Sequence, residues 1–387
     1  MIKVTNNVFY VGVNDHQIDL FEGHYDVPLG MAYNSYVIVD EKIAVMDSVG
    51  EDFFEEWLGN IKEVIKDRKV DYLIIQHMEP DHSRNLTKFL ECYPDTTVVC
   101  SAQAFKMMGQ FFPGYEIKNK LLIKEGDTLN IGKLNLSFIA APMVHWPEVM
   151  FTYLQEDKVL FSADAFGKFG ALDVEDPEGW ACEARRYYFG IVGKYGAQVQ
   201  GVLKKLANYQ VEIICPLHGP VLDKDLGYYL NLYNIWSSYG VESEGVAIFY
   251  TSVYGHTKEA VYLLGEELEK LNCPKVKICD LAREDMAECV EDAFRYGKIV
   301  LATTTFNMEI FPFMDEFIHS LVERNYQKKQ MGFIENGSWA PMAAKVMKEK
   351  LAPCKDMEYL EPTVKILSAL SEKNKEEIKE LANALMK

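Results

Sequence analysis

The sequence predicts an α/β protein in two parts, an αββα sandwich followed by a doubly wound parallel sheet. In residues 1–241, short strands alternate with helices, and polar side chains follow several of the strands. In residues 246–387, longer buried runs such as 246–250 and 330–334 alternate with helices that carry apolar stripes. The segment 239–245 between them is polar and flanked by glycine, so we place the domain boundary there.

The elements of the first part follow from apolar periodicity and turn residues. Asp40, Glu41 and Lys42 separate two apolar runs and predict a hairpin, and residues 155–158 predict a second one. The expected strands are 8–13, 35–39, 43–47, 70–75, 150–154 and 159–161, and the expected helices are 53–65 and 180–208.

The densest cluster of metal-ligand types lies in the loop after the apolar strand 70–75. Pro80 cannot continue a strand, so the chain leaves the sheet here. Neighbouring carboxylates repel each other unless a cation gathers them, which favours a metal site over a solvated acidic turn with incidental histidines. The ligand-type residues of this loop are His77, Glu79, Asp81 and His82.

Two imidazoles and two carboxylates without a thiolate suit iron, manganese or zinc. A six-residue loop does not easily wrap one ion with all four groups, so we expect two metals. Three later side chains, each at the end of a β-rich run, would complete the site. They are His145, Asp164 and His218. Taken singly, each is also typical of a hydrogen-bonded residue at a strand end.

This series resembles the metallo-β-lactamase fold, whose loop usually reads His-x-His-x-Asp-His and binds zinc. Here Glu79 replaces the second histidine, and the pattern His77-x-Glu79-x-Asp81-His82 is similar to that of the flavodiiron proteins, also called A-type flavoproteins. In some members of that family the residue at the place of His82 does not ligate. The resemblance implies one iron held by His77, Glu79 and His145, a second held by Asp81, His82 and His218, and a bridge at Asp164. The segment 21–25 also resembles a family segment near the iron site.

The second part carries a hydroxyl-rich loop, residues 251–257, between its first strand and first helix. Backbone N–H groups and the helix dipole favour a phosphate at such a helix start. No Gly-x-Gly-x-x-Gly and no Walker sequence occurs, which disfavours dinucleotides and nucleoside triphosphates. By itself the loop also fits an ordinary capped helix. It resembles the flavodoxin fold, which implies FMN as the ligand.

Two later loops, 303–308 and 335–339, support the flavin interpretation. Flavodoxins contact the isoalloxazine at the first of these, and Trp339 in the second can stack on a flat ring. The family usually has a Ser-Tyr-Gly-Trp type loop there, and this chain has a different order. The residues predicted to bind FMN are Thr251, Ser252, Val253, Tyr254, Gly255, His256, Thr257, Thr304, Thr305, Phe306, Asn307, Asn336, Gly337, Ser338 and Trp339.

Composition excludes some function classes. The formal net charge of −18 over 387 residues disfavours nucleic acid as a partner. No apolar run approaches the ~20 residues of a membrane span, and residues 1–5 do not form a signal peptide, so we expect a cytoplasmic protein. None of the eight cysteines forms Cys-x-x-Cys, which disfavours a structural zinc, a rubredoxin module or a dithiol redox centre.

The resemblance to flavodiiron proteins covers essentially the whole chain and implies an oxidoreductase. In that family FMN takes electrons from a reduced donor, such as a rubredoxin-like carrier or a deazaflavin coenzyme. Two non-haem irons then reduce O2 to water, NO to nitrous oxide, or both. The resemblance implies no catalytic side chain beyond the metal ligands. It also implies a head-to-tail homodimer, or a dimer of dimers, in which one subunit's flavin faces the other's irons.

Two alternatives stay open from the sequence. One is a zinc hydrolase of the metallo-β-lactamase fold with a flavodoxin-like electron-carrier domain. The other is an electron carrier whose first domain is only structural. The preference between O2 and NO and the choice of donor are also open.

Overall fold

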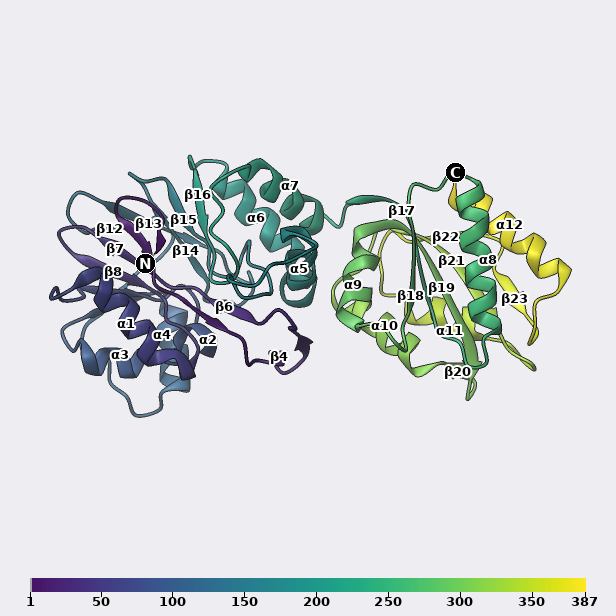
Figure 1. Ribbon diagram of the computed structural model, residues 1–387, viewed down its shortest axis with the longest axis horizontal. Helices are drawn as coiled ribbons and strands as arrows, with labels where there is room; N and C mark the ends of the chain where they lie inside the picture. Colours follow the sequence, from purple (N-terminus) through teal and green to yellow (C-terminus); the bar gives the residue numbers. More distant parts are fainter. Residues whose placement is uncertain (1) are drawn as a thin grey trace. The chain divides into compact units, whose positions relative to one another are not determined.

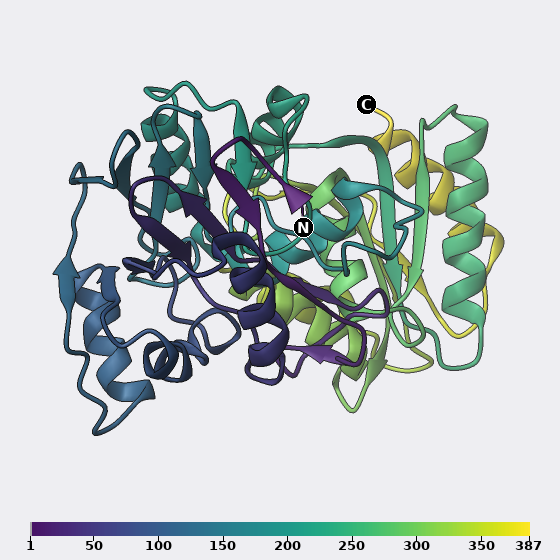
Figure 2. The same cartoon turned by 60° about the vertical axis from the view of Figure 1, so that its left-hand side comes forward.

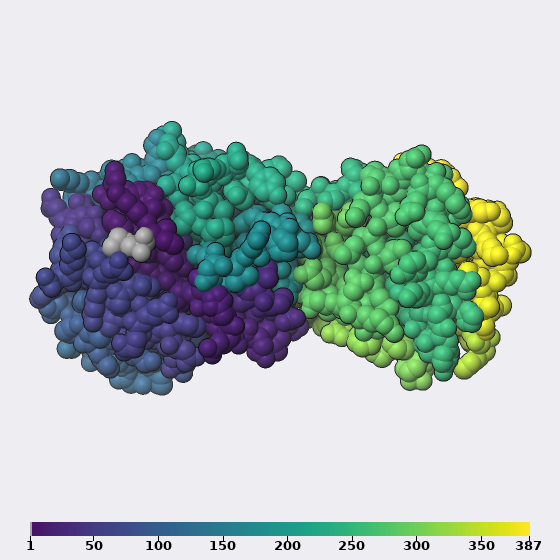
Figure 3. Space-filling model, in the orientation of Figure 1, coloured from purple at the N-terminus to yellow at the C-terminus, as the bar shows by residue number. Residues whose placement is uncertain are grey.

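The computed structural model describes residues 2–387 and divides into two compact units, Met1–Asn234 and Ile235–Lys387. In Figure 1 the first unit runs from purple to teal and the second from green to yellow. Figure 3 shows the surface of both units in the same colours. None of the helices described in these residues is both long and apolar enough to cross a membrane.

The first unit is built on two sheets that face each other across one core. Ile38, Met46 and Ile74 of one sheet and Phe138 and Phe161 of the other belong to the same buried cluster. The first sheet has the order β1 (Ile2–Lys3), β2 (Val8–Tyr10), β7 (Tyr36–Val39), β8 (Ile43–Met46), β9 (Tyr72–Ile74), β10 (Thr97–Cys100), β11 (Lys120–Leu122). The second has the order β12 (Thr128–Asn130), β13 (Asn135–Ala140), β14 (Met150–Leu154), β15 (Val159–Phe161), β16 (Ile213–Cys215).

Helices cover the outer face of each sheet, which gives the expected αββα sandwich (Figure 1). The helices next to the first sheet are α1 (Phe54–Ile65), α2 (Pro80–Ser83), α3 (Leu86–Cys92) and α4 (Ala102–Phe111). Those next to the second are α5 (Trp180–Tyr187), α6 (Gly196–Leu206) and α7 (Leu226–Ser237). Two small strand pairs lie beside the sandwich: β3 (Val13–Asp15) with β6 (Met31–Tyr33), and β4 (Leu20–Phe21) with β5 (Tyr25–Asp26).

Two predicted elements of this unit are interrupted. The strand expected over 8–13 ends at Tyr10, and β3 begins at Val13 in a different sheet. The helix expected over 180–208 is broken by a π-helical turn, Tyr188–Val192, between α5 and α6. The break brings Gly190 against Tyr25, whose hydroxyl donates to the Gly190 carbonyl at 2.8 Å. A Cβ at Gly190 would lie only 3.0 Å from the Tyr25 ring, so glycine permits this close approach.

The second unit has the doubly wound topology that the sequence predicts. Its main strands are parallel neighbours, and only β20 runs antiparallel, against β19. The order is β18 (Val276–Asp280), β17 (Ser243–Tyr250), β19 (Tyr296–Phe306), β21 (Gln330–Asn336), β22 (Glu358–Tyr359); β23 (Val364–Ile366) also pairs with β21, and β20 is Glu309–Ile310. The order reverses between β17 and β19, the place where such sheets bind their ligands.

Helices flank both faces of this sheet. In Figure 2, α8 (His256–Lys270) and α12 (Glu372–Leu385) lie side by side, and they share a buried cluster with β17 and β19. The remaining helices of this unit are α9 (Met286–Arg295), α10 (Pro312–Glu323) and α11 (Ala343–Lys350).

Candidate metal centre and cofactor pocket

All seven predicted metal ligands meet at one edge of the sandwich. The loop after β9 and the first turn of α2 supply four of them, and the segments after β13, β15 and β16 supply one each. Since these strands end at neighbouring places, their loops converge. The side chains form two groups, each with ligand atoms within 4.8 Å of one another: His77, Glu79, His145 and Asp164 in the first, and Asp81, His82 and His218 in the second.

Asp164 faces both groups. Its Oδ2 lies 3.0 Å from His145 Nε2 and 3.3 Å from His77 Nε2. Its Oδ1 lies 3.4 Å from His82 Nε2 and 3.7 Å from His218 Nε2. One carboxylate therefore points one oxygen at each group, which is the arrangement of a bridging ligand.

Each group also has a carboxylate of its own. Glu79 Oε2 lies 3.1 Å from the Nε2 atoms of both His77 and His145. Asp81 Oδ2 lies 3.1 Å from His82 Nε2 and 3.3 Å from His218 Nε2. The two groups thus offer the same donor set, two imidazole nitrogens and one carboxylate, besides the shared Asp164.

The polar atoms at the centre of the site lack ordinary partners. The Nε2 atoms of His82 and His218 face each other at 2.9 Å. Both carboxylate oxygens of Asp81 and Oδ1 of Asp164 are buried without a hydrogen bond of sound geometry within residues 2–387. Each such group costs about 1–3 kcal/mol when left unpaired. A cation at the centre of each group removes that cost, so the residues fit a pair of metal ions.

The electrostatics of the site agree with this fit. Burial lowers the pKa of His145, but hydrogen bonds to Asp164 and Glu79 raise it to about 9. Burial opposes ionisation of Asp164, yet the charge of His77 and the hydrogen bonds from His145 and His77 hold the pKa of Asp164 well below its usual range. Without a metal, the nearby carboxylates therefore favour the protonated form of the imidazoles. Metal binding releases such protons.

The second unit has a cavity of about 470 Å³ at the carboxyl ends of β17, β19 and β21. Twelve of the fifteen residues predicted to bind FMN line it, and Ser368 lines it in addition. The three others lie just outside its lining. Thr251 is buried and its hydroxyl bonds that of Thr303 at 2.6 Å, Gly255 caps the start of α8 with φ of +98°, and Asn307 lies in the exposed turn between β19 and β20.

The walls of this cavity suit a phosphate and a flat ring. Ser252 Oγ accepts from Gly255 N at 3.1 Å and from Lys258 N at 3.3 Å, which places a hydroxyl at the start of a fifteen-residue helix. Two aromatic side chains at the rim are strongly exposed, Tyr254 at 92% and Trp339 at 80%. The buried hydroxyl of Thr304 has no partner among the described residues. The rings of Tyr254 and Trp339 therefore offer a stacking surface to a ligand, and the Thr304 hydroxyl offers it a hydrogen-bond donor.

Comparison with known proteins decides the family. A family model described as ODP family beta lactamase matches residues 31–219. A nitric oxide reductase of Moorella thermoacetica is 30% identical over 370 residues, which are 93% of this chain and 92% of that protein. The chain belongs to the flavodiiron protein family.

Solved structures agree over the full length. The rubredoxin oxygen:oxidoreductase of Desulfovibrio gigas has a TM-score of 0.90 at 27% identity and covers 99% of this chain and 97% of its own. The flavodiiron protein of Giardia intestinalis has a TM-score of 0.92 at 25% identity and covers 100% and 96%. The predicted fold class and the prediction of a flavodiiron oxidoreductase are confirmed, and the zinc-hydrolase alternative is not favoured.

In this flavodiiron chain, residues that the sequence analysis did not name hold the ligands in place. Glu148 Oε1 lies 2.8 Å from His77 Nδ1 and accepts from Met78 N at 2.8 Å. His218 Nδ1 donates to the Ala32 carbonyl at 2.7 Å. The only sequence signal for Glu148 is an acidic residue two positions before the apolar strand β14 and three positions after His145.

The segment 21–25 lies beside the metal centre, as the family resemblance implies. The ring of Phe21 packs edge-on against His218 with centroids 5.4 Å apart, and Tyr187 lies 5.5 Å from the same imidazole. His24 is exposed and packs on Tyr25, so it belongs to neither ligand group.

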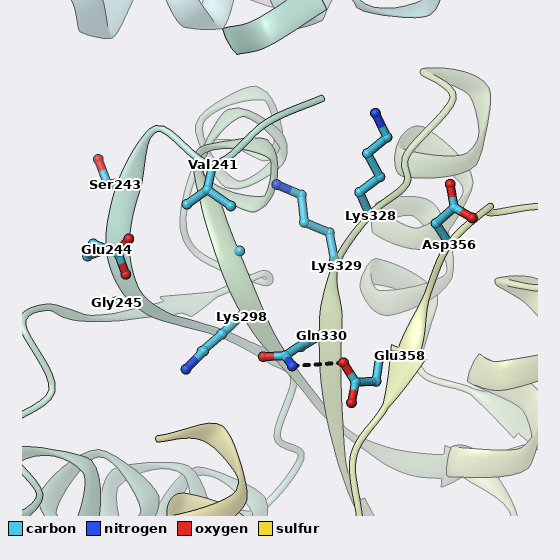
Figure 4. A pocket seen from close by; sticks show the side chains of 11 residues that line it. Val241, Ser243, Glu244, Gly245, Lys298, Lys328, Lys329, Gln330, Asp356 and Glu358 are labelled. Carbon is cyan, nitrogen blue, oxygen red and sulfur yellow. Dashed lines mark hydrogen bonds between the residues drawn. The ribbon is translucent and has the colours of Figure 1, made fainter. Parts of the chain in front are cut away.

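A second cavity of the flavodoxin-like unit, about 390 Å³, lies where β17, β19 and β21 begin (Figure 4). Lys329 is buried there, its Nζ donates to the carbonyls of Phe294 and Tyr296 at 2.7 and 2.8 Å, and burial lowers its pKa to about 7. Gln330 donates to Glu358 at 2.8 Å, the dashed line in Figure 4. Doubly wound sheets bind ligands at the opposite edge, and these side chains are paired within the protein, so we assign no cofactor to this cavity.

Proposed function

We propose that this protein reduces O2 to water, NO to nitrous oxide, or both, with FMN in residues 246–387 and two non-haem irons in residues 1–241. The observation that carries the proposal is Asp164, which presents one oxygen to each of two matched ligand groups. A pocket in the same chain is suited to a phosphate and a flat ring, and it provides a binding site for the second cofactor. The names of relatives, a nitric oxide reductase and a rubredoxin oxygen:oxidoreductase, support the reaction class.

The ligand assignment follows from the two groups. One iron would be held by His77, Glu79 and His145, the other by Asp81, His82 and His218, and Asp164 would bridge them. Two irons held in this way supply redox chemistry and open positions for a small diatomic oxidant, and FMN supplies the electron carrier.

The protein's own side chains prepare the metal centre for this role. The four imidazoles are no more than 6% exposed, and the three carboxylates no more than 16%, so bulk water has little access to the ligands. The aromatic rings of Phe21 and Tyr187 pack against His218 and form an apolar wall on that side. An enclosed, apolar wall is suited to small neutral oxidants and excludes charged solutes.

The two ends of the flavin pocket bind different parts of FMN. We assign the phosphate to the loop 251–257, where the side chains of Ser252 and Thr257 line the cavity and the start of α8 favours an anion. We assign the ring to the opposite side, between Thr304, Thr305 and Phe306 at the end of β19 and Asn336 to Trp339 after β21.

The partners are proposed from the family. The donor would be a reduced rubredoxin-like carrier or a deazaflavin coenzyme, and the assembly a head-to-tail homodimer or a dimer of dimers in the cytoplasm. The Desulfovibrio gigas relative is named for rubredoxin and oxygen, which supports the first kind of donor.

The test is metal and flavin analysis of the purified protein, followed by stopped-flow oxidation of the reduced protein by O2 and by NO side by side. We expect about two irons and one FMN per chain, and rapid reoxidation by at least one oxidant. The matched control is Glu79→His, which restores the zinc-type loop pattern and should shift the metal content from iron towards zinc. Protein that holds stoichiometric zinc and hydrolyses a substrate in that form would overturn the proposal.

A further inference from the structure

We propose that the two iron positions are not equivalent, because the buried carboxylate of Glu148 strengthens one of them. We call His77, Glu79 and His145 the His77 position, and Asp81, His82 and His218 the His218 position. The inference rests on the proposed diiron centre. It states that the iron at the His77 position is held more tightly and that Glu148 is the positioning residue responsible.

Direct ligands cannot produce this difference. Each position has two imidazole Nε2 atoms, one carboxylate and one oxygen of Asp164. The charge and the donor types are therefore the same on both sides. One difference between the two positions is the partner of the Nδ1 atom on the far side of each imidazole.

At the His77 position that partner is an anion. Glu148 Oε1 lies 2.8 Å from His77 Nδ1, and neither side chain is exposed. Since a carboxylate only accepts, Nδ1 carries the proton and the Nε2 lone pair of His77 points at the metal position. Met78 N donates to the same oxygen at 2.8 Å, so Oε1 of Glu148 is held by two donors. Ser101 Oγ donates to the Glu148 backbone carbonyl at 3.1 Å and holds the main chain there.

At the His218 position no imidazole faces an anion through Nδ1. His218 Nδ1 donates to the neutral carbonyl of Ala32 at 2.7 Å. His82 Nδ1 is buried and finds no hydrogen-bond partner anywhere in residues 2–387. The His82 ring is placed by packing instead, with its centroid 4.5 Å from that of His218 and 6.4 Å from that of Tyr33.

The other buried carboxylate near the loop, Asp47, acts on the backbone. Its Oδ1 accepts from Gln76 N at 2.8 Å and from His77 N at 3.3 Å, and its Oδ2 accepts from Gln76 Nε2 at 3.1 Å. Its carboxylate makes these three hydrogen bonds, none of them to an imidazole ring. Asp47 is therefore a matched control, a buried negative charge close to the same loop that leaves His77 Nδ1 untouched.

A carboxylate on Nδ1 makes an imidazole a stronger donor to its metal, and loss of such a partner typically weakens metal binding by about 10- to 100-fold. We therefore expect the two irons to leave the protein at different rates. The iron at the His218 position should leave first, and the iron at the His77 position about 10- to 100-fold more slowly.

The experiment adds excess 2,2′-bipyridine to the reduced holoprotein and follows the coloured ferrous complex with time. The wild type should release iron in two phases of one iron each. His145→Ala should lose the slow phase and His218→Ala the fast one, which assigns the phases. Glu148→Gln should merge both phases into the fast one, Glu148→Asp should restore part of the separation, and Asp47→Asn should keep two phases. The thermal unfolding of residues 1–234, followed by circular dichroism in every variant, reports whether the unit that carries the metal ligands is folded.

Release in a single phase from a wild-type protein that holds two irons would overturn the inference and leave the proposed function intact. So would a slow phase that survives in Glu148→Gln. Protein that never holds iron would instead contradict the proposed function. If Glu148→Gln does not fold, titration of the metal-free wild type with Co²⁺ decides the matter: two sequential spectral changes support two unequal positions, and one change overturns them.

Discussion

The proposed metal centre and the proposed flavin pocket are built in opposite ways. The metal ligands are enclosed, and Glu79 and Asp81, the most exposed of them, reach only 13% and 16%. The flavin pocket is open, and its aromatic side chains Tyr254 and Trp339 are almost fully exposed. In an enclosed site the protein holds the ligating side chains in place before the cofactor binds. In an open site the bound cofactor itself orders some of the side chains around it.

The two sites also draw on the chain differently. The metal ligands come from positions up to 141 residues apart, between His77 and His218, and the registers of two sheets bring them together. The flavin pocket is assembled mainly from three βα loops of one parallel sheet. One side chain in the metal centre therefore affects several ligands at once, while the pocket divides its contacts among independent loops. Mutations should show this contrast.

The largest effect is expected at Asp164. In Asp164→Ala the two groups lose their shared carboxylate. We expect the affinity for iron to fall by more than roughly tenfold at both positions. Loss of an outer partner of a ligand already costs about 10- to 100-fold in metal affinity, and loss of a direct ligand should cost more. His82→Ala, prepared identically, should keep a diiron centre with altered reactivity, because water can fill one open position. Iron content and oxidase rate are the measurements, and thermal unfolding followed by circular dichroism checks the folding of the unit that carries the ligands. Both irons and near-normal turnover in Asp164→Ala would remove the bridge from the model.

An intermediate effect is expected in the phosphate loop. Ser252→Ala combined with Thr257→Ala removes two hydroxyls from the cavity wall, each worth about 1.5–3 kcal/mol in a charge-assisted hydrogen bond. FMN should therefore be lost on extended dialysis at low protein concentration, while iron content stays unchanged. The matched control is Thr363→Ala, whose hydroxyl accepts from Lys348 at 3.2 Å outside the cavity. Retention of flavin by the double variant would show that the phosphate lies elsewhere.

The smallest effect is expected at the aromatic rim, where one ring of two is enough to cover a flavin. An aromatic pair contributes about 0.5–1.5 kcal/mol beyond the area it buries. Trp339→Ala should thus weaken FMN binding by roughly 2- to 10-fold, and Tyr254→Ala in parallel shows whether the second ring shares the role. Titration of flavin-free protein by FMN fluorescence gives both values. Leu367→Ala, an exposed apolar residue outside the cavity lining, should change nothing; equal values for all three variants would exclude stacking.

The sequence by itself determined the features that are local. Four ligand types in six residues after a strand, and a hydroxyl-rich loop before a helix, are short patterns whose chemistry does not depend on distant contacts. The alternation of apolar runs with helical stripes likewise predicted the fold class of both parts. The structure brings the loop residues together where the patterns predict, because strand ends and helix starts place their own side chains.

Only the tertiary structure decided the contacts between distant segments. Glu148 and His77 are 71 positions apart in the sequence. They meet because the paired strands β13 and β14 lie next to the end of β9, where the loop with His77 begins. Ser368 joins the flavin pocket because the short strand β23 pairs with β21, a pairing with no clear sequence pattern. The helix predicted over 180–208 is interrupted at a π-helical turn, where Gly190 contacts Tyr25 from the other end of the domain. Sheet register and close packing set each of these contacts. The apolar periodicity of a segment specifies neither of them, because both depend on a distant segment.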